Sequence, residues 1–417
     1  MFRFNAPRVL AALAAAGLVA TGLAVVTDGS AQASTAGAGT TALSSNWYAA
    51  APYLMPLQND PPNPTAVMAA TGIKAFQLAF ILAPNSGGCT PTWDGTNPVA
   101  TDTTVGPMIS AIRAAGGDVS VSIGGYNGTK LGQACGTPAA TAAAYQQVIT
   151  TYGLHAIDFD LEEPEIESAS SINNELGAAQ ILQKEDPGLY VSVTIPSTTT
   201  GANYFGQLLL DNAKSLGFTP NNYSIMPFDG GFSGAASQIT ALQDFNAQLS
   251  STFGWSSSTA YAHEGFSGMN GRTDTSEYFY QTDFQTVLNF AEANGLGRYT
   301  FWSLNRDREC NPPNNNGSLS SECSSVTQNA YDFTKYTVEF AGVTPPTSPP
   351  TTAPASPTAS PTGGGSGGTC AAAWSASSSY TSGQEVSYNG DNWTANQWND
   401  DEVPGGSSGA WNSDGPC

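Results

Sequence analysis

Charged residues, and basic ones above all, are scarce in this chain. Of its 417 residues 11% are charged, with 12 Lys and Arg against 33 Asp and Glu, so the net charge is −21 at pH 7. Nucleic-acid-binding proteins neutralise phosphates with Lys and Arg, so this balance argues against nucleic acid as a partner. The only histidines are His155 and His263, and no Cys-x-x-Cys pair is present. The sequence therefore argues against a zinc site.

Long apolar runs are lacking too, except at the amino terminus. Arg3 and Arg8 precede the apolar run Val9–Val26, and Ala31-Gln32-Ala33 has the small-x-small pattern of a cleavage site. This pattern predicts a signal peptide over residues 1–33 and a secreted, extracellular protein, with a single membrane anchor as the alternative. No later stretch is apolar enough to span a bilayer, so we expect no membrane association after the signal is removed.

Six cysteines in an exported chain predict three disulfide bonds. Sequence alone leaves the pairing open. Order along the chain favours the pairs Cys89–Cys135, Cys310–Cys323 and Cys370–Cys417.

A low-complexity segment divides the chain. Residues 344–369 are almost entirely Pro, Thr, Ser, Ala and Gly, a composition that forms a linker and cannot bury a core. The segment separates a large domain, residues 34–343, from a small carboxy-terminal module, residues 370–417.

Strand-like and helix-like segments alternate through the large domain. Eight strands are expected, at Asn46–Leu54, Ala75–Leu82, Asp118–Ile123, Ala156–Glu162, Leu189–Ile195, Tyr223–Asp229, Thr259–Gly265 and Arg298–Leu304. Helical patterns between them, such as Thr137–Tyr152 and Ser170–Glu185, favour an α/β (β/α)8 TIM barrel. A doubly wound open sheet is the runner-up, although the Gly-rich phosphate loop that usually follows its first strand is lacking.

Three carboxylates mark the fourth expected strand. Asp158, Asp160 and Glu162 alternate with large apolar residues, so they share one face of the strand. Crowded acids are costly to desolvate unless they share protons or meet a ligand. If the apolar residues pack on surrounding helices, the acids face the barrel interior and end at its carboxy-terminal mouth, where such barrels place their chemistry. A strand with a solvated acidic face is the alternative.

Position along this strand suggests a role for each acid. Glu162, nearest the mouth, is the best candidate for a general acid, and Asp160 is close enough to keep one carboxyl protonated near neutral pH. Asp158 lies deeper, where we expect it to share a proton with Asp160 and orient it. Glu163 and Glu165 are expected at the loop or rim.

Other strand ends carry further candidates. Gly124 and Gly125 end the third strand, where a glycine pair lets backbone or substrate approach closely. Met226 and Asp229 lie at the end of the sixth strand. Trp302 lies near the end of the eighth strand, where its ring could form an aromatic floor of the site. Each of these is more often structural when taken alone, but together they mark one site.

The small module contains more aromatic residues than so small a core can hold. Six aromatics lie between two terminal cysteines: Trp374, Tyr380, Tyr388, Trp393, Trp398 and Trp411. A disulfide joining the ends suits a domain too small to stabilise itself by burial. One or two aromatics are therefore expected at the surface, where flat rings stack on the apolar faces of sugars.

The large domain resembles glycoside hydrolase family 18, the chitinase family. Ser122-Ile-Gly-Gly125 matches the family's SxGG motif, and the last three acids of its DxxDxDxE motif are Asp158, Asp160 and Glu162, while its first Asp falls on His155. Met226-Pro-Phe-Asp229 resembles the Met-x-Tyr-Asp motif, with Phe228 in place of Tyr. Trp302-Ser-Leu-Asn-Arg-Asp307 is similar to secreted actinobacterial chitinases.

The small module resembles carbohydrate-binding module family 5/12. Its Trp, Tyr, Gly and Cys positions follow that family's pattern. The family usually has a Trp-Trp pair where this chain has Gln397-Trp398. The resemblance makes Trp393 and Trp398 candidate chitin-binding residues on an all-β module.

These resemblances imply a chitinase, of endo type, that acts on chitin or N-acetylglucosamine oligosaccharides as a monomer without metal or organic cofactor. The implied mechanism is retaining and substrate-assisted: Glu162 protonates the glycosidic oxygen, the substrate's acetamido oxygen attacks, and Asp160 stabilises the oxazolinium ion. Many family members use a Tyr hydroxyl at the position of Phe228, which has none. Tyr126 or Tyr261 could donate in its place. A catalytically silent chitin-binding lectin, an endo-β-N-acetylglucosaminidase acting on N-glycans and, more weakly, a cellulase are the alternatives.

Overall fold

The computed structural model describes residues 42–310, 318–342, 370–375, 379–380, 384–395, 399–400, 403–405 and 410–417. The predicted signal peptide and linker lie outside the described residues. The chain forms two compact units, Met1–Ser348 and Pro349–Cys417, and each is considered by itself.

Eight parallel strands form the centre of the large unit in its described part. They are β1 (Tyr53–Leu54), β2 (Ala75–Leu82), β5 (Asp118–Gly124), β6 (Ala156–Asp160), β7 (Tyr190–Thr198), β9 (Asn222–Met226), β10 (Glu264–Met269) and β13 (Arg298–Trp302), and each pairs with the next in this order. The two ends of the sheet meet, because the Thr300 hydroxyl on β13 donates to the Ala51 carbonyl just before β1 at 2.5 Å. The predicted (β/α)8 barrel is confirmed.

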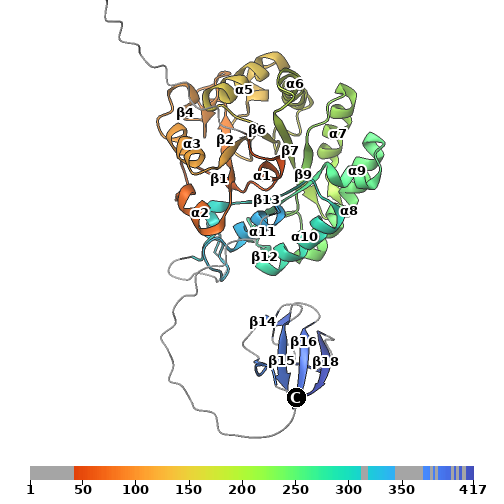
Figure 1. Ribbon diagram of the computed structural model, residues 1–417. Coiled ribbons are helices and arrows are strands. Elements are labelled where there is room, and N and C mark those ends of the chain that lie inside the picture. Colours follow the sequence, from red (N-terminus) through yellow and green to blue (C-terminus); the bar gives the residue numbers. More distant parts are fainter. Residues whose placement is uncertain are drawn as a thin grey trace, which may run out of the picture. The chain divides into compact units, whose positions relative to one another are not determined.

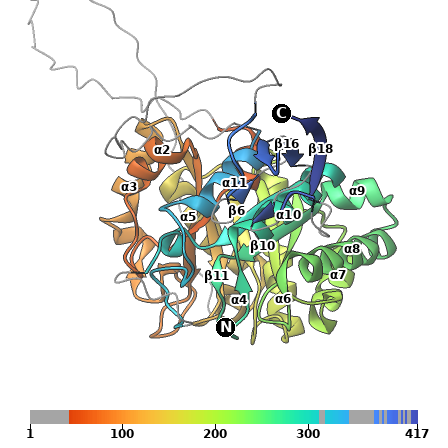
Figure 2. The ribbon, with the colours of Figure 1, turned by 90° about the horizontal axis from the view of Figure 1, so that it is seen from below.

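Helices surround the strands (Figures 1 and 2). They are α1 (Ser45–Ala49), α2 (Pro64–Thr71), α3 (Val105–Ala114), α4 (Leu131–Cys135), α5 (Pro138–Tyr152), α6 (Ala169–Glu185), α7 (Tyr204–Leu216), α8 (Gly234–Phe253), α9 (Ser257–Ala262), α10 (Gln281–Asn294) and α11 (Asp332–Phe340), with short 3-10 turns at Val99–Thr101 and Leu304–Arg306. Side chains such as Thr137 and Asn203 cap the helix starts, and Gly153 and Gly217 end helices in the left-handed conformation.

The packing of β6 decides which way its acids face. Ile157, Phe159 and Leu161 are fully buried, and the Phe159 ring meets the Tyr145 ring of α5 edge-on at 5.6 Å. Successive side chains of a strand point to opposite faces. The acids of β6 therefore face the barrel interior, as the sequence predicted.

Short strands form small pairs within the loops that follow the barrel strands. The pairs are β3 (Thr92–Trp93) with β4 (Asn97–Pro98), β8 (Gly201–Ala202) with the end of β7, and β11 (Gly271–Arg272) with β12 (Tyr278–Phe279). All of them follow the carboxy-terminal ends of barrel strands, so they lie at that end of the barrel.

Two of the eight predicted strands overlap helices, and the fourth, sixth and eighth end earlier than predicted, at Asp160, Met226 and Trp302. Residues 46–49 of the first belong to α1, and only Tyr53–Leu54 is strand; short apolar runs do not distinguish the two structures. The seventh, Thr259–Gly265, begins inside α9, and β10 starts only at Glu264. The Ser256 side chain accepts a hydrogen bond from Thr259 N and so starts that helix.

The small unit is all-β, as expected, in its described residues. Strands β15 (Glu385–Tyr388), β16 (Asp391–Ala395) and β18 (Trp411–Pro416) form an antiparallel sheet, and β14 (Ser379–Tyr380) pairs with β17 (Asn399–Asp400). Its core consists of Tyr380, Val386, Ala395, Ala410 and Trp411.

All three predicted disulfides are present: Cys89–Cys135, Cys310–Cys323 and Cys370–Cys417. In the described part of the chain, no helix is long and apolar enough to cross a membrane.

Candidate active site

A cavity of about 1080 Å³ lies at the carboxy-terminal ends of the barrel strands. Five of the predicted site residues line it: Asp160, Glu162, Met226, Asp229 and Trp302. They come from three different strands or the loops after them, β6, β9 and β13, so the fold alone brings them together. Asp158, Gly124 and Gly125 lie outside its lining.

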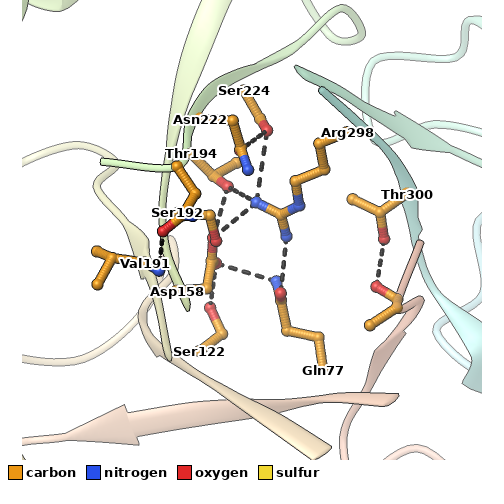
Figure 3. A network of polar contacts seen from close by, with 12 residues as sticks. Gln77, Ser122, Asp158, Val191, Ser192, Thr194, Asn222, Ser224, Arg298 and Thr300 are labelled. Atoms are coloured by element: carbon orange, nitrogen blue, oxygen red, sulfur yellow. Dashed lines mark hydrogen bonds and ion pairs between the residues drawn. The ribbon is translucent and has the colours of Figure 1, made fainter. Parts of the chain in front are cut away.

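Asp158 is the centre of a buried polar network (Figure 3). It is fully buried, and its carboxylate forms an ion pair with Arg298 at 2.8 Å. Five more groups donate to it at 2.5–3.0 Å, namely the Tyr53, Ser122, Ser192 and Thr194 hydroxyls and the Gln77 amide. We expected Asp158 to share a proton with Asp160. In the structure its charged partner is instead the guanidinium of Arg298.

Arg298 was missed in the sequence. Its guanidinium is fully buried and crosses the barrel interior from β13, donating to Asp158 and, at 2.7 Å, to the Gln77 side chain (Figure 3). A signal was available, because Arg298 alternates with Thr300 and Trp302 on β13 and so faces the interior as Asp158 does.

Asp160 lies directly above this network. It is 3% exposed, and its Oδ1 atom has no hydrogen-bond partner in the structure. Burial, followed by the negative charges of Glu162 and Asp158, holds its pKa well above the usual range, although Arg298 and Tyr53 oppose this. The raised pKa favours the protonated form of Asp160, whose side chain lines the cavity.

Glu162 follows β6 and is partly accessible from the cavity. Desolvation raises its pKa to about 7, and the carboxylates of Glu163, Asp274 and Asp229 add to this, while Lys130 lowers it. At neutral pH Glu162 is thus protonated in a large share of the protein molecules, and this proton can be donated into the cavity.

A second cluster of titratable groups lies behind Glu162. Lys130 is 1% exposed, and its ammonium donates to the carbonyls of Tyr126 at 2.9 Å and Gly128 at 3.3 Å. Glu165 is fully buried rather than at the rim as predicted, because the chain turns inward after residue 163 and sets it beside Glu175. Burial and the neighbouring Glu175 hold the pKa of Glu165 well above its usual range.

The glycine pair after β5 serves close packing. A Cβ on Gly124 would lie 2.1 Å from the Asp160 carbonyl oxygen, and one on Gly125 would lie 2.8 Å from the Phe80 ring. Both adopt positive φ, and Gly125 N donates to that Asp160 carbonyl at 2.8 Å. The pair thus lets β5 lie against the backbone of Asp160.

Trp302, predicted as an aromatic floor of the mouth, belongs to a cluster of three aromatic rings at the cavity. Its ring stacks on Phe80 with centroids 5.5 Å apart and planes 15° apart, and meets Tyr53 edge-on at 5.9 Å. All three rings line the cavity.

The segment after Trp302 holds the mouth together. The Asn305 side chain accepts from Met55 N at 2.9 Å and donates to carbonyls of residues 55, 58 and 59, which belong to a cavity loop. Asp307 accepts from Thr334 N at 2.7 Å and Phe333 N at 3.1 Å in the first turn of α11. Sequence alone identified this segment only by resemblance.

Phe228 is half-buried and lines the cavity beside Met226 and Asp229. Of the two hydroxyls considered as substitutes, Tyr126 lines the cavity and is 65% exposed. Tyr261 does not, because it lies on α9, before the amino-terminal end of β10, and packs on Phe290.

His155 lies at the opposite end of the barrel from the cavity. Its Nδ1 atom is 2.9 Å from the Asp118 carboxylate, which also accepts from Arg113 at 2.7 Å and Tyr48 at 2.6 Å. A histidine at this position therefore joins a structural polar cluster.

In the small unit, Trp393 on β16 is half-buried rather than fully exposed. Its indole N–H donates to the Tyr388 carbonyl at 3.2 Å, and its ring lies close to Gly405. Trp398 lies outside the described residues.

Within the described residues, no group of three or more His, Cys, Asp or Glu side chains is arranged to hold a metal ion. The titratable groups that line the cavity include the carboxyls of Glu162 and Asp160, and Glu162 is the candidate proton donor.

Comparison with known proteins agrees with this architecture. The model of carbohydrate-binding module family 5/12 matches residues 373–412. The catalytic domain of a hyperthermophilic chitinase from Pyrococcus furiosus superposes with a TM-score of 0.63 at 25% identity, covering 70% of this chain and 94% of that one. The large unit thus has a chitinase-like fold.

Two curated relatives extend the comparison. A probable bifunctional chitinase/lysozyme of Escherichia coli is 28% identical over 275 residues, which is 62% of this chain and 30% of the relative. Endochitinase 11 of Metarhizium anisopliae is 26% identical over 280 residues, 62% of this chain and 52% of the relative. The chain thus matches about a third and about half of the length of these relatives.

Proposed function

We propose that this protein is a secreted, endo-acting chitinase that hydrolyses β-1,4-linked N-acetylglucosamine polymers. The observation that carries the proposal is Glu162, a carboxyl group facing a large cavity with its pKa raised to about 7. Protonation of a glycosidic oxygen requires such an acid. The chitinase-like fold, the chitinase relatives and the matched carbohydrate-binding module support chitin as the substrate. The segment Trp302–Asp307 favours the secreted actinobacterial type.

The proposed mechanism is retaining and substrate-assisted. Glu162 donates its proton to the glycosidic oxygen while the substrate's own acetamido oxygen attacks the anomeric carbon, so an oxazolinium ion forms and the aglycon sugar leaves. The carboxylate of Glu162 then takes a proton from the water that opens the oxazolinium, which returns the acid to its starting state. Only the substrate and water are consumed.

Asp160 has a role in this mechanism that its environment supports. Its unpartnered Oδ1 is available to the acetamido N–H, and the positive charge of the oxazolinium favours the ionised form of Asp160 in the intermediate. Asp158 stays paired with Arg298 beneath it, so the charge below Asp160 is fixed.

Phe228 leaves the acetamido oxygen without the usual tyrosine hydroxyl. The absent donor corresponds to a loss of about 2–4 kcal/mol at the transition state, by analogy with an oxyanion-hole donor. The exposed Tyr126 side chain, which also lines the cavity, is the substitute we propose.

The small unit is proposed to bind chitin and to hold the barrel near an insoluble surface. Joining two binding parts in one chain raises the local concentration of one at the site of the other. We expect the whole protein to act as a monomer, with Trp393 and Trp398 contributing to binding. Sedimentation with insoluble chitin tests this, and full-length Trp393→Ala and Trp398→Ala variants should each bind less than the parent.

Product analysis distinguishes the candidate functions. The parent and Glu162→Gln are incubated with soluble N-acetylglucosamine oligomers, an N-glycopeptide and cello-oligomers. We expect the parent to cleave only N-acetylglucosamine oligomers, at internal bonds, and the variant to bind them without cleavage. Binding without cleavage by both would identify a lectin, and cleavage of the glycopeptide alone an endo-β-N-acetylglucosaminidase.

A further inference from the structure

The loop that contains Asp229 is held in place by contacts with another part of the chain. Asp229 follows β9 in the left-handed conformation, with φ at 56°, and Gly230 and Gly231 come directly after it. Such a loop has many accessible conformations, and a non-glycine residue is disfavoured in this one. The position of the Asp229 carboxylate in the cavity therefore needs an external restraint.

The restraint comes from the hairpin formed by β11 and β12. The carboxylate of Glu277, just before β12, accepts three backbone N–H groups of the Asp229 loop. Its Oε2 accepts from Asp229 N at 2.6 Å, and its Oε1 accepts from Gly231 N and Phe232 N, both at 2.7 Å. Hydrogen bonds to an ionised carboxylate are stronger than neutral ones, and three of them satisfy N–H groups that belong to no strand or helix.

The same hairpin also binds the side chain of Asp229. The Asp229 Oδ1 atom accepts from both the backbone N–H and the hydroxyl of Thr275, each at 2.8 Å. Residue 229 is thus held at its amide by Glu277 and at its carboxylate by Thr275. These three contacts fix both its backbone and its side-chain direction.

The hairpin is itself anchored to the barrel. The buried guanidinium of Arg306 donates to the Asn270 carbonyl at 2.8 Å and to the Arg272 carbonyl at 2.5 Å. Gly271 permits close contact, since a Cβ there would lie 2.0 Å from the Ser324 carbonyl oxygen. A continuous set of contacts therefore runs from the 3-10 turn after β13 through the hairpin to Asp229.

Asp229 matters because it lines the same cavity as Glu162, and its charge acts on that acid. We propose that Glu277 and Thr275 are positioning residues, which hold the Asp229 carboxylate in the cavity that Glu162 also lines. This role rests on the proposed chitinase function. Neither residue was identified from the sequence, because the hairpin belongs to a loop between the seventh and eighth barrel strands.

The Thr275 pair of variants tests the role with little risk to folding. Thr275→Val removes the hydroxyl, whereas Thr275→Ser keeps it, and both leave the three Glu277 contacts in place. On soluble N-acetylglucosamine oligomers we expect Thr275→Val to lower kcat about three- to tenfold with KM within about twofold, because the contact is used in the transition state more than in binding. Thr275→Ser should recover most of the lost kcat.

Glu277→Gln provides the second test. The amide retains one acceptor oxygen but presents N–H groups to a backbone donor, so we expect kcat to fall more than in Thr275→Val and amide hydrogen exchange in residues 229–232 to accelerate. Glu292→Gln, an exposed substitution on α10, is the matched control and should change neither quantity.

The outcomes separate the two proposals. A parent that cleaves none of the oligomers contradicts the chitinase function, and the positioning role with it. An active parent, with equal kcat in Thr275→Val and Thr275→Ser and unchanged hydrogen exchange in Glu277→Gln, overturns the positioning role alone.

Discussion

Removing Arg298 should lower the free energy of unfolding, because it leaves a buried charge without its partner beneath the active site. Arg298→Met leaves Asp158 fully buried without its ion-pair partner. Breaking a buried pair by removing one partner costs about 3–5 kcal/mol, because the remaining charge is uncompensated. Five other donors still contact Asp158, so we place the expected loss in the free energy of unfolding near the lower end, at about 3 kcal/mol.

Urea unfolding of the parent, Arg298→Met, Asp158→Asn and the double variant measures this cost. The double variant has no unpaired charge, so it should be less destabilised than the sum of the single variants, by about 1–3 kcal/mol. Arg308→Met is the matched control. Its partner Asp60 is exposed, and we expect a loss below about 1 kcal/mol. Equal losses in Arg298→Met and Arg308→Met, or additive effects in the double variant, would refute the reasoning.

Three further changes have expected results. Lys130→Met removes a charge that lowers the pKa of Glu162, so the alkaline limb of the kcat–pH profile should move to higher pH; a limb that stays in place or moves down would count against it. Phe228→Tyr should raise kcat on soluble oligomers, because the exposed Tyr126 replaces the absent hydroxyl only in part, and no gain would contradict this. Glu264 is fully buried with its pKa raised well above the usual range, so its contribution to stability is present below pH 4.5 and is lost as pH rises. Glu264→Gln should therefore have a higher Tm relative to the parent at pH 8 than at pH 5, and an equal difference at both would contradict this.

Repeated local patterns made the barrel predictable. Apolar strands alternated with capped helices, and strand β2 was predicted with its observed bounds, Ala75–Leu82. The failures were at α1 and α9, where short apolar or Ala-rich runs carry little periodicity. The small strands that wall the mouth were also missed, because two-residue strands leave no pattern.

The acids of the site were predictable because β6 alternates strictly, whereas their partners were not. Arg298 and Gln77 are about 140 and 81 residues away from Asp158 in the sequence, and only the closed barrel makes them neighbours. The sequence predicted Glu165 at the rim. Its buried position beside Glu175 depends on tertiary packing, which the sequence does not reveal. Glu277 acts on Asp229 through backbone N–H groups, which no side-chain pattern reveals.

The account depends most on Glu162 acting as the proton donor of a retaining, substrate-assisted hydrolysis. Proton NMR of the anomeric signals during cleavage of a soluble N-acetylglucosamine tetramer tests this directly. The account predicts that the parent first releases the β-anomer and that Glu162→Gln, although it binds the tetramer, releases no product above background. Initial release of the α-anomer, or cleavage by Glu162→Gln at the parent rate, would contradict it.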